Sequence, residues 1–255
     1  MEKNRYEIKA EDALPGMTLV EVAASPLPLP DRDTLDERER EIFDWVMDRM
    51  KRYYYSYPST AGTEYRMTPL YQGLLQSPRC AEIVSTASDF YQTAEGRGSY
   101  SNRDRDFVQI SYTPVLAEMM GKTSHLPIVA IADAVGSGIA PEDVKAILDG
   151  RLEDLAPEDR ELVEYIQAVA RGALTRRHFE GLKARMGPKA AMEYTCYITF
   201  KIGNQWTLMA MWGIQDKPND STPSFNLLQA YLDGEAEAHP ADRGVSFVEP
   251  RDKVK

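Results

Sequence analysis

The sequence predicts an all-α protein. One segment after another of the 255-residue chain places apolar residues at helical spacing, and Pro and Gly breakers separate these segments. Several of the segments begin with Pro in the first turn, a position that tolerates its missing N–H group. The residues therefore indicate a series of helices joined by short connections.

Composition narrows the class of protein. Forty acidic against thirty basic residues give a formal charge of −10, which repels phosphate backbones and anionic membrane surfaces. The two cysteines, Cys80 and Cys196, lie far apart and form no CxxC pair, so neither a redox dithiol nor a zinc site is indicated. We expect no nucleic-acid partner, no membrane partner, no metal and no cofactor.

The N-terminal part is predicted to be an arm followed by a helix. Residues 1–34 form the extended arm, because Pro and Leu alternate near their end. Charged residues stand where a secretory signal would have its apolar core, so we expect a cytoplasmic protein. The first helix begins near Leu35 with acids in its first turn. A tyrosine-rich connection follows, whose aromatic rings either line a pocket or cover the core.

The middle of the chain predicts a run of further helices. Pro114 is expected to kink or restart one of them, Thr175 to cap another, and Gly187 with Pro188 to stop one helix and start the next. The helices are expected at residues 69–76, 78–94, 107–119, 125–135, 156–172, 178–186 and 188–214. Residues 136–150 are expected to form a turn and then a short helix with Pro141 near its first turn. Residues 215–255 are predicted to be a tail with one short segment, Phe225 to Leu232, that docks on the body of the protein or on a partner chain.

The last predicted helix, residues 188–214, is apolar nearly all round. It is about as long as a membrane span, but Lys201 near its middle is costly in lipid. A helix of this kind must be buried on several sides, and one monomeric bundle would struggle to cover it. The sequence therefore predicts a homo-oligomer.

Four passages of the chain form a recognisable series: PLYQGLLQSPRCAEIV with the helix before it, NRDRDFVQI, HLPIVAIADAVGSGIAPEDVKAILDGRLEDLAPEDRELVEYIQAVA, and RMGPKAAMEYTCYITFKIGNQWTLMA. In this order they resemble the carboxymuconolactone decarboxylase and alkylhydroperoxidase-D-like superfamily. Together they cover residues 35–214, which we take as the domain. The resemblance implies an all-helical bundle, alkylhydroperoxidase-D-like, that assembles into trimers or hexamers, with a pocket between helices and often at a subunit boundary. Members decarboxylate or hydrolyse small lactones, or reduce peroxides through a CxxC pair.

The chain departs from the peroxidase-like members of that superfamily. Where they carry Glu, two cysteines and His on the alanine-rich helix, this chain has Leu126, Val129, Ala130 and Asp133. Thiol peroxidase chemistry needs a thiolate of low pKa with a resolving partner nearby. Peroxidase activity is therefore excluded from the expected functions.

The candidate catalytic residues are His125, Glu118 and Tyr112. His125 could act as a general base oriented by Glu118, while Tyr112 donates to a developing oxyanion. The alternative is structural: a histidine at a helix entry that caps backbone groups, beside a solvated glutamate. Breakers between Glu118 and His125 leave open whether the two side chains meet.

Four further residues are candidates for substrate binding. Arg97 and Arg103, in a run with Arg105, flank glycines and a helix start and could hold a substrate carboxylate. Ion pairing with Asp104 and Asp106 explains the same run equally well. Tyr55, in the aromatic connection, and Trp206, on the last helix, could line an apolar pocket, although packing between subunits is the alternative for Trp206.

Together with the resemblance, which implies the lactone decarboxylase type, these residues lead us to expect a cofactor-independent enzyme. Its expected substrate is a small carboxylated or aromatic-derived metabolite, and its expected chemistry is proton transfer. Two alternatives stay open. One is a non-catalytic member of the fold that binds a small molecule or serves in an assembly, and the other is a lyase or isomerase whose pocket is rebuilt from the loop at Tyr53 to Tyr57.

Overall fold

The computed structural model describes residues 27, 29–55, 69–92, 100–120, 126, 128–213 and 222–238. Within these ranges the chain forms helices and no strand, which confirms the prediction of an all-α protein. Most of the predicted arm and of the tail lies outside the described residues. The alkylhydroperoxidase-D-like topology and the domain boundaries stay predictions.

The helices follow the predicted order along the chain. Those of the first half are η1 (Arg32–Thr34), α1 (Glu37–Tyr55), α2 (Pro69–Leu74), α3 (Pro78–Gln92) and α5 (Asn102–Met120). Those of the second half are α6 (Ile128–Gly136), α7 (Pro141–Asp149), η3 (Leu152–Asp154), α8 (Pro157–Ala170), α9 (Arg176–Gly213) and α10 (Thr222–Leu232).

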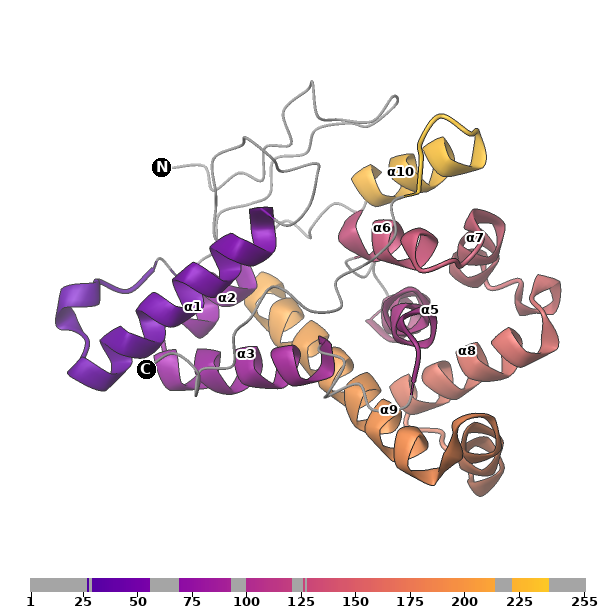
Figure 1. The fold of residues 1–255 in the computed structure, drawn as a ribbon, viewed down its shortest axis with the longest axis horizontal. Coiled ribbons are helices and arrows are strands. Elements are labelled where there is room, and N and C mark those ends of the chain that lie inside the picture. Colours follow the sequence, from indigo (N-terminus) through magenta and orange to yellow (C-terminus); the bar gives the residue numbers. More distant parts are fainter. Residues whose placement is uncertain are drawn as a thin grey trace.

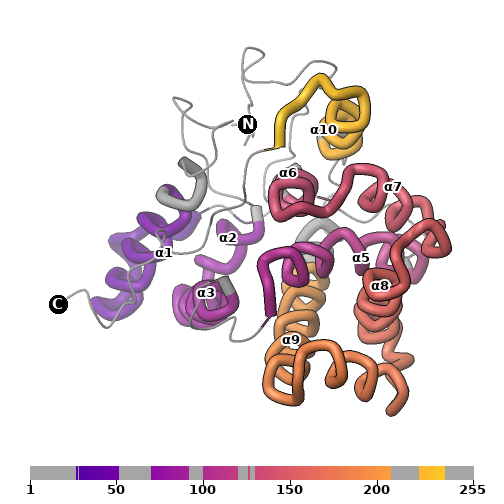
Figure 2. The backbone as a smooth tube through the Cα atoms, turned by 45° about the vertical axis from the view of Figure 1, so that its right-hand side comes forward, coloured from indigo at the N-terminus to yellow at the C-terminus, as the bar shows by residue number. Residues whose placement is uncertain are grey.

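The helices form two groups, each with its own apolar core (Figure 1). The smaller core lies between α1, α2 and α3 and contains Ile42, Val46 and Leu75, all without exposed surface. The larger core surrounds α5, which Figure 2 shows between α6 and α7 on one side and α8 and α9 on the other. The C-terminal half of α9 runs from the larger group toward the smaller one (Figure 1).

Aromatic contacts join α3 of the smaller group to α9. The ring of Tyr91 lies 5.4 Å from the ring of Tyr197 and 5.4 Å from that of Phe200, measured between centroids. These separations are within the range of attractive aromatic pairs. The side chains on α9 are therefore held by packing from both groups of helices.

Helix α5 is one element from Asn102 to Met120, so of the two outcomes expected at Pro114 the restart is wrong, whereas the kink stays a prediction. Pro114 lacks an N–H group and leaves one backbone carbonyl of the preceding turn without its helical partner. The flanking residues Tyr112, Val115 and Leu116 are all buried. Burial of these neighbours on several sides outweighs the local penalty of the proline.

The predicted start and stop signals are confirmed in the second half of the chain. Pro141 and Pro157 stand in the first turns of α7 and α8, as the sequence predicts. The structure adds that Gly150 ends α7 with a left-handed φ of 76°. Thr175 precedes α9, and its N–H donates to Nδ1 of His178 over 3.2 Å. His178 thereby takes part in the helix cap.

The predicted docking segment lies in α10, which packs on α6 and α7 (Figure 1). Leu227, Leu228 and Ala230 are buried against the larger core. The hydroxyl of Ser224 donates to the carbonyl oxygen of Leu126 over 2.5 Å. In the structure this segment therefore packs on the body of the protein.

A break divides α9 at Gly187, as predicted. Its φ of 82° and ψ of 164° are not helical, and Pro188 follows as a new first-turn residue. Beyond the break one face of the helix is buried in the core, whereas a stripe along the opposite face is exposed. The stripe consists of Met192, Cys196, Thr199, Gly203 and Trp206.

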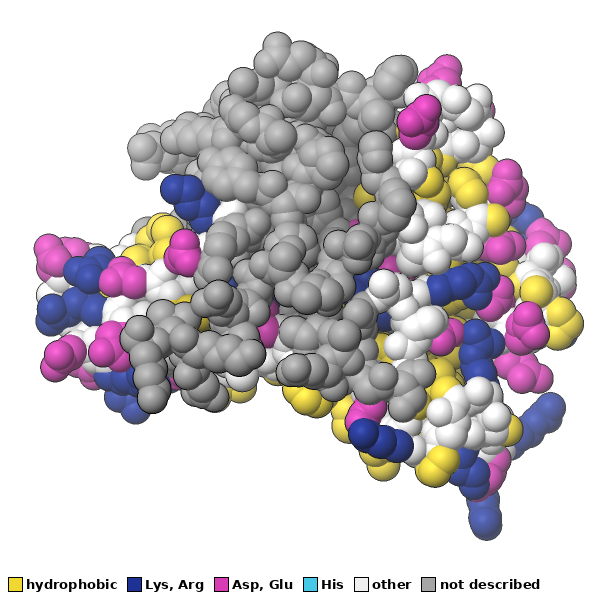
Figure 3. Space-filling view, viewed as in Figure 1, with side chains coloured by type: hydrophobic (Ala, Val, Ile, Leu, Met, Phe, Trp, Pro, Cys, Tyr) yellow, Lys and Arg dark blue, Asp and Glu magenta, His cyan; other side chains and the backbone are white. Residues whose placement is uncertain are grey.

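Charged side chains of both signs lie on the described surface. On the face drawn in Figure 3, basic and acidic side chains are interspersed over α1 and over the region of α8 and α9. None of the described helices is long and apolar enough to cross a membrane.

Candidate functional site

The first turn of α5 carries four consecutive charged residues, Arg103 to Asp106. Ser101 caps this turn together with Asp104. The Ser101 hydroxyl accepts the N–H of Asp104 over 3.0 Å, and the Asp104 carboxylate accepts the Ser101 N–H over 3.3 Å. This reciprocal capping box fixes where the helix begins and hence which way each charge points.

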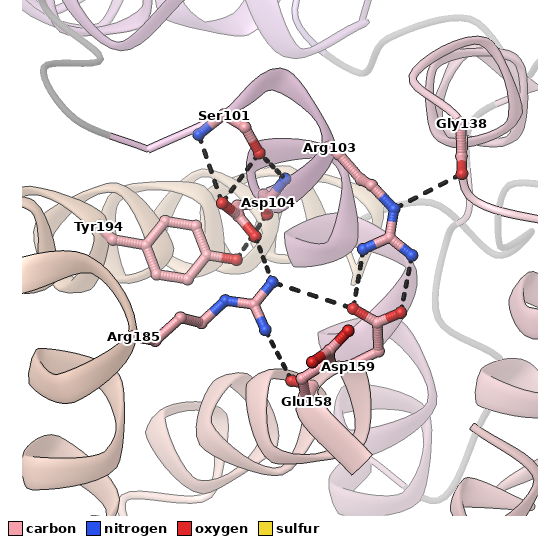
Figure 4. Close-up of polar contacts among 8 residues, drawn as sticks. All are labelled: Ser101, Arg103, Asp104, Gly138, Glu158, Asp159, Arg185 and Tyr194. Carbon is pink, nitrogen blue, oxygen red and sulfur yellow. Dashed lines mark hydrogen bonds and ion pairs between the residues drawn. The ribbon is translucent and has the colours of Figure 1, made fainter. Parts of the chain in front are cut away.

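Arg103 and Asp104 belong to an outer network with Asp159 of α8 and Arg185 of α9 (Figure 4). Arg103 donates to both carboxylate oxygens of Asp159, over 2.7 and 2.6 Å. Arg185 donates to Asp104 over 2.8 Å and to the backbone oxygen of Glu158 over 2.8 Å. Each charge of this network therefore has an opposite charge against it.

The outer network ties several elements to the start of α5. Nε of Arg103 lies 3.5 Å from the carbonyl oxygen of Gly138, in the turn between α6 and α7. The hydroxyl of Tyr194 donates to the backbone oxygen of Asp104 over 2.5 Å (Figure 4). Because its charges are paired and its contacts reach four elements, we assign this network an architectural role.

Arg105 and Asp106 form a second cluster, the inner cluster, in the core. Nε and Nη2 of Arg105 donate to the two carboxylate oxygens of Asp106 over 2.7 and 3.0 Å. Only 4% of the Arg105 side chain and 6% of the Asp106 side chain are exposed. Charged groups are rarely buried to this extent in proteins, and burial of a pair carries a desolvation cost.

Polar groups on two other helices interact electrostatically with the Arg105–Asp106 pair. The charges of Arg105 and Asp106 both act on the pKa of Tyr197 in α9. The charge of Asp133 in α6 acts on the pKa of Arg105 and on that of Tyr231 in α10. The inner cluster is therefore defined as Arg105, Asp106, Asp133 and Tyr197, from α5, α6 and α9, and both α6 and α9 pack against α5.

The protonation states of Arg105 and Tyr197 are set by burial and by the ion pair. Burial works to lower the pKa of Arg105, but hydrogen bonding and the charge of Asp106 outweigh it, so the pKa is raised. Burial raises the pKa of Tyr197 well above its ordinary value, against the opposing charge of Arg105. Arg105 therefore stays charged and Tyr197 keeps its proton at neutral pH.

One polar atom of the inner cluster has no partner. Nη1 of Arg105 is shielded from solvent and makes no hydrogen bond to any group in the described part of the chain. Leaving a buried donor unsatisfied costs about 1–3 kcal/mol, and more for a charged group. Such an atom in a native structure requires an explanation, and an acceptor on a bound molecule is one.

The structure separates the predicted catalytic residues. Tyr112 is buried, and its hydroxyl acts on the pKa of Tyr197, so it lies toward the inner cluster. Burial raises the pKa of Tyr112 as well. Glu118 lies at the other end of α5 with 70% of its side chain exposed, and it pairs with Arg171 over 2.8 Å. His125 lies outside the described residues, so whether it meets Glu118 stays a prediction.

The predicted substrate-binding residues are also dispersed. Arg103 binds Asp159, so the sequence-based alternative of an ion pair holds for it, although with a different partner from Asp104 or Asp106. Trp206 is 41% exposed on the stripe of α9. Arg97 and the side chain of Tyr55 lie outside what the structure describes.

The sequence indicates Arg105 and Asp106 only as part of a charged run. The helical spacing gives a more specific signal for a buried position of Arg105. Arg105 lies three residues before Val108 and seven before Tyr112, so the three share a helix face. A charged residue on the face that points into the core indicates a buried polar site. The identity of its partners from α6 and α9 depends on tertiary structure.

In the described ranges no three His, Cys, Asp or Glu side chains are placed to hold a metal ion. Comparison of the chain with models of known families, with curated proteins and with solved structures gives no match.

Proposed function

We propose that the protein is a cofactor-independent enzyme that acts on a small molecule by acid/base chemistry, with the inner cluster as its centre. The observation that carries this proposal is the buried Nη1 of Arg105 without an acceptor. A native core rarely leaves a charged donor unsatisfied. A bound molecule that supplies an acceptor oxygen would remove this cost.

The inner cluster contains the groups that proton transfer requires. Arg105 and the protonated hydroxyl of Tyr197 can donate to an oxygen on which negative charge develops. The carboxylate of Asp106 adjoins this donor and can receive or return a proton. Burial strengthens both interactions, because the surroundings of the cluster have a low dielectric constant.

The resemblance to the carboxymuconolactone decarboxylase superfamily is part of this proposal. Four sequence passages support it, and the all-helical architecture is compatible with it. The two cysteines, Cys80 and Cys196, are free and exposed, on α3 and α9. We therefore propose chemistry of the decarboxylase, lactone or lyase type and not thiol-dependent reduction of peroxides.

A non-catalytic binding protein is the second candidate function. It is favoured by the tyrosines, because burial raises the pKa values of Tyr112, Tyr194 and Tyr197. Their hydroxyls stay protonated at neutral pH and so supply hydrogen bonds but no base. A site of such donors fits retention of a ligand as well as its conversion.

Turnover of a panel of lactones and aromatic-acid metabolites tests the proposal. If Asp106 moves the proton, Asp106→Asn should lower kcat by about 10²–10⁴-fold, the usual contribution of a general acid or base. Asp44→Asn is the matched control, because Asp44 also pairs with an arginine through two oxygens but lies exposed on α1. Its kcat should equal that of the wild type.

The outcomes distinguish the proposed enzyme from a binding protein, and Asp106 from His125 as the catalytic residue. Turnover that survives Asp106→Asn but is lost in His125→Ala would move the catalytic centre to His125. Saturable binding of a panel member that is weakened in Tyr197→Phe, without turnover of any compound, would favour the binding protein. Turnover unaffected by all three changes would sink the proposed site.

A further inference from the structure

The Arg105–Asp106 pair is electrically neutral as a unit. Asp106 occupies Nε and Nη2 of the guanidinium, so the positive charge already has its counter-charge at hydrogen-bond distance. Nη1 remains as a donor within a neutral pair. The atom that it can bind is therefore selected by hydrogen bonding and not by an uncompensated positive charge.

We propose that the group bound at Nη1 of Arg105 is an uncharged carbonyl oxygen, as in a ketone, ester or amide, and not a carboxylate or phosphate. This inference rests on the proposed function, since it names the class of molecule that the inner cluster accepts. It differs from the sequence-based expectation of a small carboxylated or aromatic-derived metabolite, because the group held by Arg105 is not a carboxylate.

The physical reason is the charge that an anion would add. A carboxylate at Nη1 would be the second anion against one arginine, in a site where the Arg105 side chain is only 4% exposed. Asp133 acts on Arg105 as a further negative charge from α6. Burying an uncompensated anion is far more costly than burying a neutral acceptor that receives one hydrogen bond.

The neighbouring tyrosine fits the same class of ligand. The charges of the pair act on Tyr197, which is 6% exposed and keeps its proton. A neutral hydroxyl completes the hydrogen bonds of a carbonyl oxygen, which has two lone pairs, but brings no charge to neutralise an anion. Arg105 and Tyr197 would thus share one carbonyl oxygen.

Benzamide and benzoate provide a matched test, because they have nearly the same size and shape but differ in charge at pH 7. Dissociation constants are measured for both by NMR titration of the full-length wild-type protein. We expect benzamide to bind more tightly than benzoate by about tenfold or more, since placing like charges together disfavours the wrong partner strongly. This comparison requires no variant to fold.

Asp106→Asn tests whether the negative charge of Asp106 causes the preference for an uncharged ligand. The change removes the counter-charge and keeps the shape, so the bare guanidinium should now prefer benzoate and the selectivity should reverse. Asp44→Asn, which opens an exposed arginine–carboxylate pair instead, should leave the selectivity unchanged. Circular dichroism checks that each variant is folded, and if Asp106→Asn is not, the wild-type comparison decides.

Each result decides something different. Tighter binding of benzoate by the wild type, weakened in Tyr197→Phe, would overturn this inference and leave the proposed site in place. Equal affinities in the wild type would overturn it too. Binding of neither compound up to its solubility limit would overturn the inference together with the proposed site.

Discussion

Arg103 on α5 and Asp159 at the start of α8 face each other as a two-pronged ion pair, with nitrogen–oxygen distances of 2.7 and 2.6 Å. Only 8% of the Asp159 side chain is exposed, against 33% for Arg103. The guanidinium also lies over the ring of Phe107, 4.8 Å from its centroid. This pair connects α5, the helix that carries Arg105 and Asp106, to the start of α8.

Breaking that pair should destabilise the protein. Arg103→Gln leaves the buried carboxylate of Asp159 without its partner, so we expect the free energy of unfolding to fall by about 1–3 kcal/mol, less than for a fully buried pair because Arg103 is partly solvated. Urea denaturation measures the change. Asp44→Asn, at an exposed pair, should leave the midpoint nearly unchanged. Equal effects of the two variants would contradict the architectural role.

The same pair should contribute to acid sensitivity. The hydrogen bond from Arg103 lowers the pKa of Asp159, so the folded protein takes up this proton less readily than the unfolded chain. The contribution to stability is therefore complete above the ordinary carboxyl pKa of about 3.9 and is lost as pH falls through the lowered value. Unfolding midpoints at pH 6 and pH 3 should differ less for Asp159→Asn than for the wild type. An unchanged difference would contradict the assignment.

The break in α9 depends on the backbone of Gly187. Its φ of 82° with ψ of 164° is a conformation that is nearly exclusive to glycine. Gly187→Ala should cost about 1–3 kcal/mol of stability through backbone strain. Gly181, in the same element and without a positive φ, is the control: Gly181→Ala should stabilise by about 0.5–1 kcal/mol. Thermal melts compare the two, and a stabilising Gly187→Ala would contradict the geometry.

The homo-oligomer predicted from the sequence, a trimer or hexamer, stays a prediction. The exposed stripe of α9 supports it, because Met192 and Trp206 are 56% and 41% exposed there and their spacing with the residues between them is that of a helix–helix seam. Thr199→Glu, at the middle of the stripe, should shift light scattering toward the single-chain mass. Ala184→Glu, before the break and also exposed, should not. A wild-type protein of single-chain mass would refute the prediction.

Start and stop signals in the sequence predict most of the helices, because these signals act within a few residues. Pro141, Pro157 and Thr175 mark starts, and Gly187 marks a break, just where the structure has them. The helix does not restart at Pro114, where the cost of a proline inside a helix is outweighed by burial of its neighbours. That burial comes from other helices and leaves no local mark.

The amino-acid order by itself determined that this chain is helical, where its charged run lies and that no CxxC pair is present. Only the tertiary structure decided that adjacent residues of that run do different things. Arg103 turns toward Asp159, whereas Arg105 turns into the core beside Tyr197. The physical reason is that a helix advances about 100° per residue, so neighbours in sequence face different surroundings, and distant helices supply their partners.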